Sequence, residues 1–223
     1  MRRPPLRIAG VYAILDLPYP YPVSPTEVAR ALIEGGAGVI QLRAKAADGG
    51  ERRRWAEAIA ELCQAAQIPL IINDDLELAE SGLAGVAGVH LGQSDLGVLL
   101  GSAGAARRER LRERQIALGL STHNLAQLQA ALRLDPDYVG FGPVFATASK
   151  ANADPVVGVE GLARACGEST VAVVAIGGID SSRGPELARA GASAIAAIGA
   201  LTGETVEIIR ARTSALARAF AIT

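Results

Sequence analysis

Charged side chains gather at the ends of three apolar segments in the N-terminal half of the chain. Arg43 and Lys45 end the segment VIQLRAK, Asp74 follows LIIN, and Asp95 ends VHLGQSD. A site that holds a polyanion both by direct ion pairs and through a bridging divalent metal needs cations beside carboxylates. The pattern therefore predicts a diphosphate site.

The available donor types narrow the choice of metal. The chain has two histidines and two cysteines, with no thiolate cluster, so zinc is not expected. Oxygen ligands favour Mg²⁺, which binds through one or two carboxylates together with waters and substrate phosphates. We expect Asp74 and Asp95 to hold Mg²⁺. Each could instead cap the helix after it, because aspartate is a favoured N-cap, and Asp75 is expected to have that role.

The order of apolar and amphipathic segments predicts the elements that position these groups. Strands that are almost wholly apolar are buried on both faces, and their alternation with helical segments indicates parallel pairing. Eight such units in 223 residues favour one closed (β/α)8 barrel, an α/β fold, over residues 1–223. An open doubly wound sheet is the alternative, but the first strand lacks the Gly-rich turn that this fold needs. The expected strands are 8–16, 38–43, 68–73, 87–92, 115–120, 137–142, 171–177 and 193–199.

In such a barrel the carboxyl ends of all strands meet at one rim, where barrel active sites lie. Ser121 follows the fifth expected strand, and Thr147 and Lys150 lie in the loop after the sixth. Gly178, in a Gly-Gly-Ile-Asp-Ser turn expected to enter a helix, and Gly199 offer backbone N–H groups to a phosphate. Two anion sites are expected, one at these glycines and one at Arg43, Lys45, Lys150 and the acidic pair.

Composition limits the partners. The formal net charge is -1 and no long block of like charge occurs, so neither a nucleic acid nor a membrane is an expected partner. We expect a soluble, cytoplasmic protein that binds small molecules. Cys63 and Cys166 lie in helix-like segments and are expected to be buried thiols. The residues 97–114 are expected to form a polar loop and a basic helix. A homodimer is compatible with such a barrel.

A known family shares these motifs. The succession QLRAK, INDD, GVHLGQSD, LGLSTHN, DYVGFGPVFATASK and AIGGID followed by GASAIAAIGAL resembles thiamine phosphate synthases, in the same order over nearly the whole chain. Those enzymes are (β/α)8 barrels that join hydroxymethylpyrimidine diphosphate to a thiazole phosphate and release pyrophosphate, with Mg²⁺ on the leaving group.

The resemblance assigns roles to the rim residues. It implies that Asp74 and Asp95 hold the Mg²⁺. It implies that the pyrimidine diphosphate contacts Gln41, Leu42, Arg43, Ala44, Lys45, Asn73, Ser121 and Lys150. It implies that the thiazole phosphate contacts Thr147, Ser149, Gly178, Ile198 and Gly199, and Ala148 is also expected to contact a substrate. Catalysis would consist of stabilising the departing pyrophosphate, and the residues expected to carry it are Arg43, Lys45, Lys150 and Ser121.

Some positions depart from the family pattern, and other functions stay open. Gly199 stands where the family often has a phosphate-binding Ser, and Ala146 and Ser149 stand where Pro and a second Thr are usual. A related barrel tautomerises thiazole phosphate and would use His123 as acid or base. A barrel that binds phosphate ligands without turnover is the third hypothesis. The presence of Lys45 and Asp95 favours the synthase.

Overall fold

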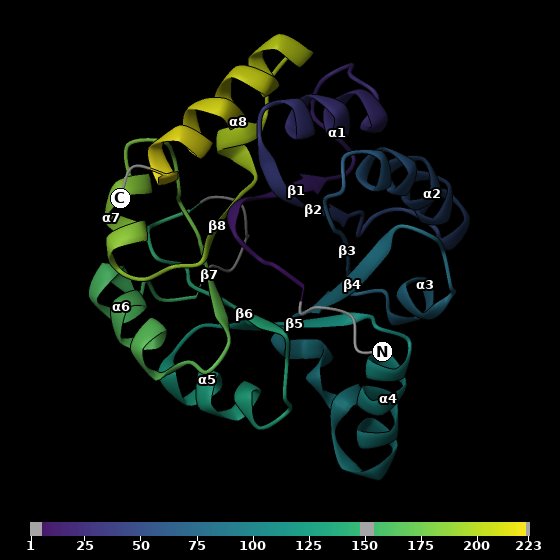
Figure 1. Ribbon diagram of the computed structural model, residues 1–223, viewed down its shortest axis with the longest axis vertical. Coiled ribbons are helices and arrows are strands. Elements are labelled where there is room, and N and C mark those ends of the chain that lie inside the picture. The colour runs from purple at the N-terminus through teal and green to yellow at the C-terminus, as the bar shows by residue number, and fades with distance from the viewer. Residues whose placement is uncertain (1–5, 148–153, 222–223) are drawn as a thin grey trace.

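The computed structural model describes residues 6–147 and 154–221, and these form a closed barrel of eight parallel strands. The strands follow chain order around the barrel, and β8 closes on β1 (Figure 1). The predicted (β/α)8 fold is confirmed, because an open sheet would leave β1 and β8 unpaired. The strands are β1 Gly10–Asp16, β2 Ala37–Arg43, β3 Leu70–Asn73, β4 Val86–Leu91, β5 Ala117–Thr122, β6 Tyr138–Phe141, β7 Ala172–Ile176 and β8 Ala194–Ala197.

Helices surround the barrel and connect successive strands (Figure 1). None of the helices in the described residues is long and apolar enough to cross a membrane. The helices are α1 Pro25–Glu34, α2 Gly49–Ala65, α3 Leu76–Glu80, α4 Gly101–Glu113, α5 Leu125–Leu132, α6 Gly158–Glu168, α7 Gly184–Arg189 and α8 Val206–Ala221, with the short 3₁₀ helices η1 Gln93–Leu99 and η2 Gly199–Leu201.

Side chains alternate between two hydrophobic cores along each strand, because successive strand residues point to opposite faces. On β1, Tyr12 and Ile14 belong to the core inside the barrel, and Val11 and Leu15 belong to the larger core between the strands and the helices. The same alternation on β2 turns Gln41 inward and buries Leu42 among the helices. The inward residues near the strand ends therefore determine the site.

Three local features differ from the sequence-based expectation. Strand β5 continues to Thr122, so Ser121 lies within the strand and points into the barrel. Residues 97–99 end η1 and residues 101–113 form α4, so the region holds the expected basic helix but no long polar loop. The helix after the Gly-Gly-Ile-Asp-Ser turn begins only at Gly184, so no helix end reaches Gly178.

Three arginines of the basic helix α4 have partners within the chain. Arg107 lies 3.7 Å from Glu80, and Arg112 pairs with both Glu109 and Asp135 at 3.1 and 2.7 Å. Arg108 donates to the carbonyl of Leu99 at the end of η1. These contacts attach α4 to neighbouring segments of the chain, so its arginines contribute to the structure of the barrel exterior.

Candidate active site

A cavity of about 340 Å³ opens at the carboxyl-terminal rim of the barrel. Its inner wall is made by inward side chains of the strands, including Tyr12, Gln41 and Tyr138. Its mouth is made by residues from the loops after the strands, including Thr147 and Gly178. The cavity therefore joins a closed, partly apolar interior to a polar rim, as a site for a heterocycle that carries a phosphate requires.

Arg43 is held at this rim by Asp16. The two residues end β2 and β1 and are direct register partners. A guanidinium nitrogen of Arg43 lies 2.5 Å from Oδ1 of Asp16. This contact fixes one side of the guanidinium plane and leaves its other N–H groups for a ligand, because a guanidinium carries five donors in a rigid fork.

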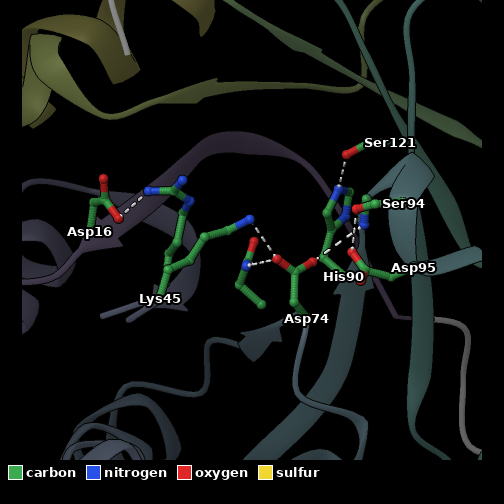
Figure 2. Close-up of polar contacts among 10 residues, drawn as sticks. Asp16, Lys45, Asp74, His90, Ser94, Asp95 and Ser121 are labelled. Atoms are coloured by element: carbon green, nitrogen blue, oxygen red, sulfur yellow. Dashed lines mark hydrogen bonds and ion pairs between the residues drawn. The ribbon is translucent and has the colours of Figure 1, made fainter. Parts of the chain in front are cut away.

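Lys45 lies two residues after the end of β2, and its side chain reaches Asp74, the residue after β3. Its Nζ is 2.9 Å from Oδ2 of Asp74, and the lysine side chain is 58% exposed. The same carboxylate oxygen accepts a hydrogen bond of 2.7 Å from Nδ2 of Asn73. Figure 2 shows Lys45 and Asp74 pointing toward one another across the rim. The predicted cation and the predicted metal ligand are therefore brought together.

Asp74 has an unusual backbone that directs its carboxylate. Its φ is 59°, in the left-handed region that few non-glycine residues adopt. Its N–H donates to the carbonyl of His90 at 2.9 Å, and its Oδ1 accepts from the N–H of Gly92 at 3.3 Å. The neighbouring strand thus fixes Asp74 in this conformation, and the carboxylate faces the end of β4.

The two predicted metal ligands meet beside Gly92. A Cβ added to Gly92 would lie 3.3 Å from Oδ2 of Asp95 and 4.0 Å from Oδ1 of Asp74. In Figure 2 both carboxylates are drawn on this side of the rim. The absence of a side chain at Gly92 leaves space between two carboxylates, which fits a small oxygen-binding cation such as Mg²⁺. The described residues hold no group of three or more metal-binding side chains, so substrate and water would complete the coordination.

Of the three aspartates after β3 and β4 that could cap a helix, only Asp75 does so. Asp75 caps α3 by accepting from the N–H of Leu78 at 2.9 Å, and it pairs with Arg52 at 2.5 Å. Neither Asp74 nor Asp95 caps a helix. The prediction for Asp75 is confirmed, and the carboxylates of Asp74 and Asp95 are not used as caps.

A chain of hydrogen bonds crosses the barrel interior. Nε2 of Gln41 donates to the hydroxyl of Tyr12 at 2.7 Å, and this hydroxyl lies 2.8 Å from that of Tyr138. The hydroxyl of Tyr138 is 3.1 Å from Nδ1 of His90, whose Nε2 is 2.9 Å from Oγ of Ser121. Burial raises the pKa of both tyrosines, so both hydroxyls stay protonated. Two predicted substrate-binding residues, Gln41 and Ser121, are thereby linked.

His123 lies at the mouth with both ring nitrogens near partners. Its Nδ1 is 2.6 Å from the carbonyl oxygen of Gly142, and its Nε2 is 3.4 Å from Oδ2 of Asp154. A carbonyl oxygen only accepts, so Nδ1 carries a proton. These contacts hold His123 against the loop after β6.

The opposite side of the mouth is built from small residues. Gly177 and Gly178 have φ of 101° and 63°, and a Cβ on Gly178 would lie 2.4 Å from the carbonyl oxygen of Ala146. Glycine is therefore required at this close approach between the β7 and β6 loops. The guanidinium of Arg183 lies 4.1 Å above the ring of Phe145 and donates to the carbonyl of Gly178. The turn is thus held in place by a cation beside the expected phosphate position.

Comparison with known proteins gives the same family as the motifs. A family model described as thiamine monophosphate synthase matches residues 11–201. The thiamine-phosphate synthase of Chlorobium limicola is 40% identical over 189 residues, which are 85% of this chain and 86% of the relative. That of Methanocella arvoryzae is 37% identical over 87% of each chain.

The chain belongs to the thiamine monophosphate synthase family. A solved structure agrees: thiamine phosphate pyrophosphorylase from Pyrococcus furiosus superposes with a TM-score of 0.79 at 27% identity, over 95% of both chains. Membership in the thiamine monophosphate synthase family makes the protein a transferase of thiamine biosynthesis.

The structure places the predicted site residues in four groups. Lys45, Asp74 and Asp95 lie close together at the strand ends but are not among the residues that line the cavity. A second group lines the cavity, namely Gln41, Arg43, Asn73, Ser121, Thr147, Gly178, Ile198 and Gly199. The side chains of Leu42 and Ala44 are buried in the outer core, so only their backbone atoms can reach a substrate. The predictions for Ala148, Ser149 and Lys150 lie outside the described residues.

Several residues that line the candidate site or contact its residues were not predicted from the sequence as parts of it. Tyr12 and Tyr138 look like core residues within apolar strands, and Arg183 follows the turn that was thought to bind phosphate through its backbone. Asp16 ends the first strand, and this position at the rim was the available signal. Asp154, which lines the cavity and lies 3.4 Å from Nε2 of His123, was also not predicted.

Proposed function

We propose that the rim of this barrel transfers the pyrimidinylmethyl group of hydroxymethylpyrimidine diphosphate to the ring nitrogen of a thiazole phosphate. The products are thiamine phosphate and pyrophosphate. The proposal is supported above all by one arrangement: Lys45 lies 2.9 Å from Asp74, and Asp74 shares with Asp95 the space beside Gly92. Cation and carboxylates together suit a diphosphate that is bound with a divalent metal.

In this proposal the cations bind the leaving group. Arg43, fixed on one side by Asp16, directs its free N–H groups at the diphosphate, and Lys45 turns from Asp74 to a phosphate oxygen. Mg²⁺ held by Asp74 and Asp95 would neutralise charge that develops on the departing pyrophosphate. Preorganised charges of this kind are worth most where charge appears in the transition state. Lys150 is proposed to join them on the basis of the family resemblance.

The cavity is proposed to align the two heterocycles. The carbon–oxygen bond to the pyrophosphate breaks, and the thiazole nitrogen supplies the electron pair for the new carbon–nitrogen bond. No proton is removed in this step, so no general base is needed. The apolar inner wall, which includes Ile14, Val174 and Ile176, would keep water from competing with the thiazole nitrogen.

Phosphate binding at the second site would use the backbone at Gly178 and at the Ile198–Gly199 step. Both positions line the cavity, and they follow β7 and β8, which lie across the barrel from β3 and β4, the strands that precede the acidic pair. Thr147 lies in the same lining and offers a hydroxyl. This arrangement places the two anionic groups of the substrates at separate parts of one mouth.

The tautomerase alternative is disfavoured by the contacts of His123. Its Nδ1 and Nε2 lie 2.6 and 3.4 Å from Gly142 and Asp154. A general acid or base needs a nitrogen directed at the substrate proton. Both nitrogens of His123 instead face the protein.

The reaction itself tests the proposal. The purified protein is incubated with pyrimidine diphosphate and thiazole phosphate, with Mg²⁺ or with excess EDTA, and thiamine phosphate and pyrophosphate are both measured. We expect equal amounts of the two products, and only with Mg²⁺. Conversion of a thiazole phosphate tautomer without the pyrimidine substrate would indicate the tautomerase. Ligand-induced thermal stabilisation without any product would indicate a binding protein.

We also propose that the enzyme works in the cytoplasm on small molecules and forms a homodimer. The net charge of -1 and the lack of a membrane-spanning helix in the described part of the chain support a protein without nucleic-acid or membrane partners. Analytical ultracentrifugation would measure the oligomeric state.

A further inference from the structure

We infer that a hydrogen-bond relay runs through Tyr12, Tyr138 and His90, in which each group donates to the next. As a result, the hydroxyl of Ser121 donates its hydrogen to a ring nitrogen of the pyrimidine substrate. The three residues act through Ser121 and are positioning residues. The inference rests on the proposed function for the identity of the substrate. The direction of the relay rests on the contacts alone.

The direction is set at Gln41, because an amide nitrogen can only donate. Nε2 of Gln41 is 2.7 Å from the hydroxyl of Tyr12, so the tyrosine oxygen accepts this hydrogen bond. Tyr12 then donates a hydrogen bond to the hydroxyl of Tyr138, which lies 2.8 Å away. Burial raises the pKa of both phenols, which keeps each of them able to donate.

The relay continues through His90 to the cavity. Tyr138 accepts from Tyr12 and donates its own hydrogen to Nδ1 of His90 at 3.1 Å. An imidazole that accepts at Nδ1 carries its proton on Nε2, which is 2.9 Å from Oγ of Ser121. Ser121 thus accepts from His90, and its own hydrogen is left for the cavity that it lines. Figure 2 shows His90 directed at Ser121.

Glycines on two strands make space for this relay. A Cβ on Gly119 would lie 2.1 Å from Cζ of Tyr138, so the tyrosine ring occupies the place of a side chain on β5. A Cβ on Gly140 would lie 3.4 Å from Cε1 of His90. The relay is therefore built into the packing of the barrel interior, and no rim loop is needed to form it.

The acceptor that meets Ser121 is assigned to the heterocycle because of its surroundings. Ser121 lines the same cavity as the interior side chains Tyr138 and Val174, whereas Arg43 lies at the strand end. A partly apolar wall that presents a hydroxyl donor suits a flat ring with an unprotonated nitrogen. A substrate analogue with a C–H group at that ring position would lose the hydrogen bond.

Nitrogen-15 NMR of the histidines tests the direction. The chain has only His90 and His123, and a His90→Asn variant assigns the two sets of signals. We expect His90 to be the Nε2–H tautomer and His123 to carry a proton on Nδ1. A wild-type His90 with its proton on Nδ1 would overturn the inference. Nδ1 would then donate to Tyr138, Nε2 would accept the hydrogen of Ser121, and the Ser121 hydroxyl could only accept from the substrate.

Two buried tyrosines provide matched variants. Tyr12→Phe and Tyr138→Phe both lose the bond between the two hydroxyls, but only Tyr138→Phe loses the bond to His90. Loss of one neutral hydrogen bond gives a roughly three- to tenfold rise in KM for the pyrimidine diphosphate in Tyr138→Phe, together with a changed His90 tautomer ratio. Tyr12→Phe should change both less. Pyrophosphate affinity should stay unchanged in both variants, and an exposed control, Tyr21→Phe, should match wild type.

The failures of the two proposals can be told apart. A wild-type protein that makes no thiamine phosphate but shows the Nε2–H tautomer of His90 would contradict the function and retain the relay. An active protein in which Tyr138→Phe and Tyr12→Phe change KM and the His90 signals equally would contradict the relay and retain the function. A Tyr138→Phe variant that weakens pyrophosphate as much as the pyrimidine substrate would contradict the assignment to the ring.

Discussion

Nζ of Lys45 lies 2.9 Å from Oδ2 of Asp74, while Oδ1 of the same carboxylate faces Gly92. One aspartate therefore contacts both the cation after β2 and the space shared with Asp95. The lysine and aspartate side chains are 58% and 25% exposed. An ion pair with this exposure contributes at most about 1 kcal/mol to folding, so its importance lies in binding.

Replacing Lys45 should affect catalysis and leave stability almost unchanged. Loss of a charge-assisted contact to the diphosphate of about 1.5–3 kcal/mol predicts that Lys45→Met lowers kcat/KM roughly 10- to 150-fold. The free energy of unfolding should change by less than about 1 kcal/mol. Arg53→Met is the matched control, because Arg53 forms an exposed pair with Glu57 on α2. Steady-state kinetics and urea unfolding measure the two effects, and parallel losses of both would contradict the role of Lys45.

The adjacent residues Asp74 and Asp75 should respond in opposite ways. Asp75→Ala removes a helix cap worth about 0.5–2 kcal/mol and leaves Arg52 without its carboxylate, so unfolding should require less denaturant. Activity per folded molecule should stay near wild type. Asp74→Asn keeps a residue that tolerates the left-handed backbone and should lose most Mg²⁺-dependent activity with little change in stability. Similar activity losses in both variants would refute the division of roles between metal binding and capping.

A methyl group at Gly92 should weaken the metal site. Its backbone, with φ of -79°, is accessible to alanine, but the added Cβ would enter the space between Asp74 and Asp95. Gly92→Ala should therefore raise the Mg²⁺ concentration needed for half-maximal activity. Gly97→Ala is the control within the same 3₁₀ helix, because a Cβ there meets nothing within 4 Å. Equal Mg²⁺ dependence of the two variants would place the metal elsewhere.

A serine at Gly199 should improve binding of the thiazole phosphate. A Cβ at this position meets no atom within 4 Å, so the side chain can be added without displacement. A hydroxyl donor to a phosphate is a charge-assisted hydrogen bond of about 1.5–3 kcal/mol. Gly199→Ser should therefore lower KM for the thiazole phosphate roughly tenfold or more and leave KM for the pyrimidine diphosphate unchanged. An unchanged KM for the thiazole phosphate would show that the phosphate binds away from η2.

The strand ends could be predicted from the sequence, and their partners could not. The position of Arg43 at the end of an apolar segment was enough to place it at the rim, since all parallel strand ends in a barrel face one side. Its ion pair with Asp16 depends on the register between β1 and β2. The register is set by how the strands pair in the closed barrel. The residue types of Asp16 and Arg43, 27 positions apart, do not by themselves predict that they pair.

The hydrogen bonds of the interior relay could likewise not be predicted from the sequence. Tyr12 and Tyr138 are aromatic residues within apolar strands, and such residues are most often core. The signal for a polar interior was the presence of Gln41 in β2 and His90 in β4, because buried polar groups need partners. Which partners they have depends on which side chains of five strands point inward, namely those of β1, β2, β4, β5 and β6. The expected turn at Gly178 is present, but the helix end expected beside it lies further along the chain. The Asp180 side chain closes a turn with Ser182 before α7 begins at Gly184.

Calorimetric titration of pyrophosphate into the protein, with and without Mg²⁺, tests most directly whether cations and carboxylates at this rim hold a metal-bound diphosphate. We predict that pyrophosphate binds at one site per chain in wild type with Mg²⁺, that EDTA weakens this binding strongly, and that Asp74→Asn removes the dependence on Mg²⁺. Pyrophosphate binding of equal strength with Mg²⁺ and with EDTA in wild type would contradict the account.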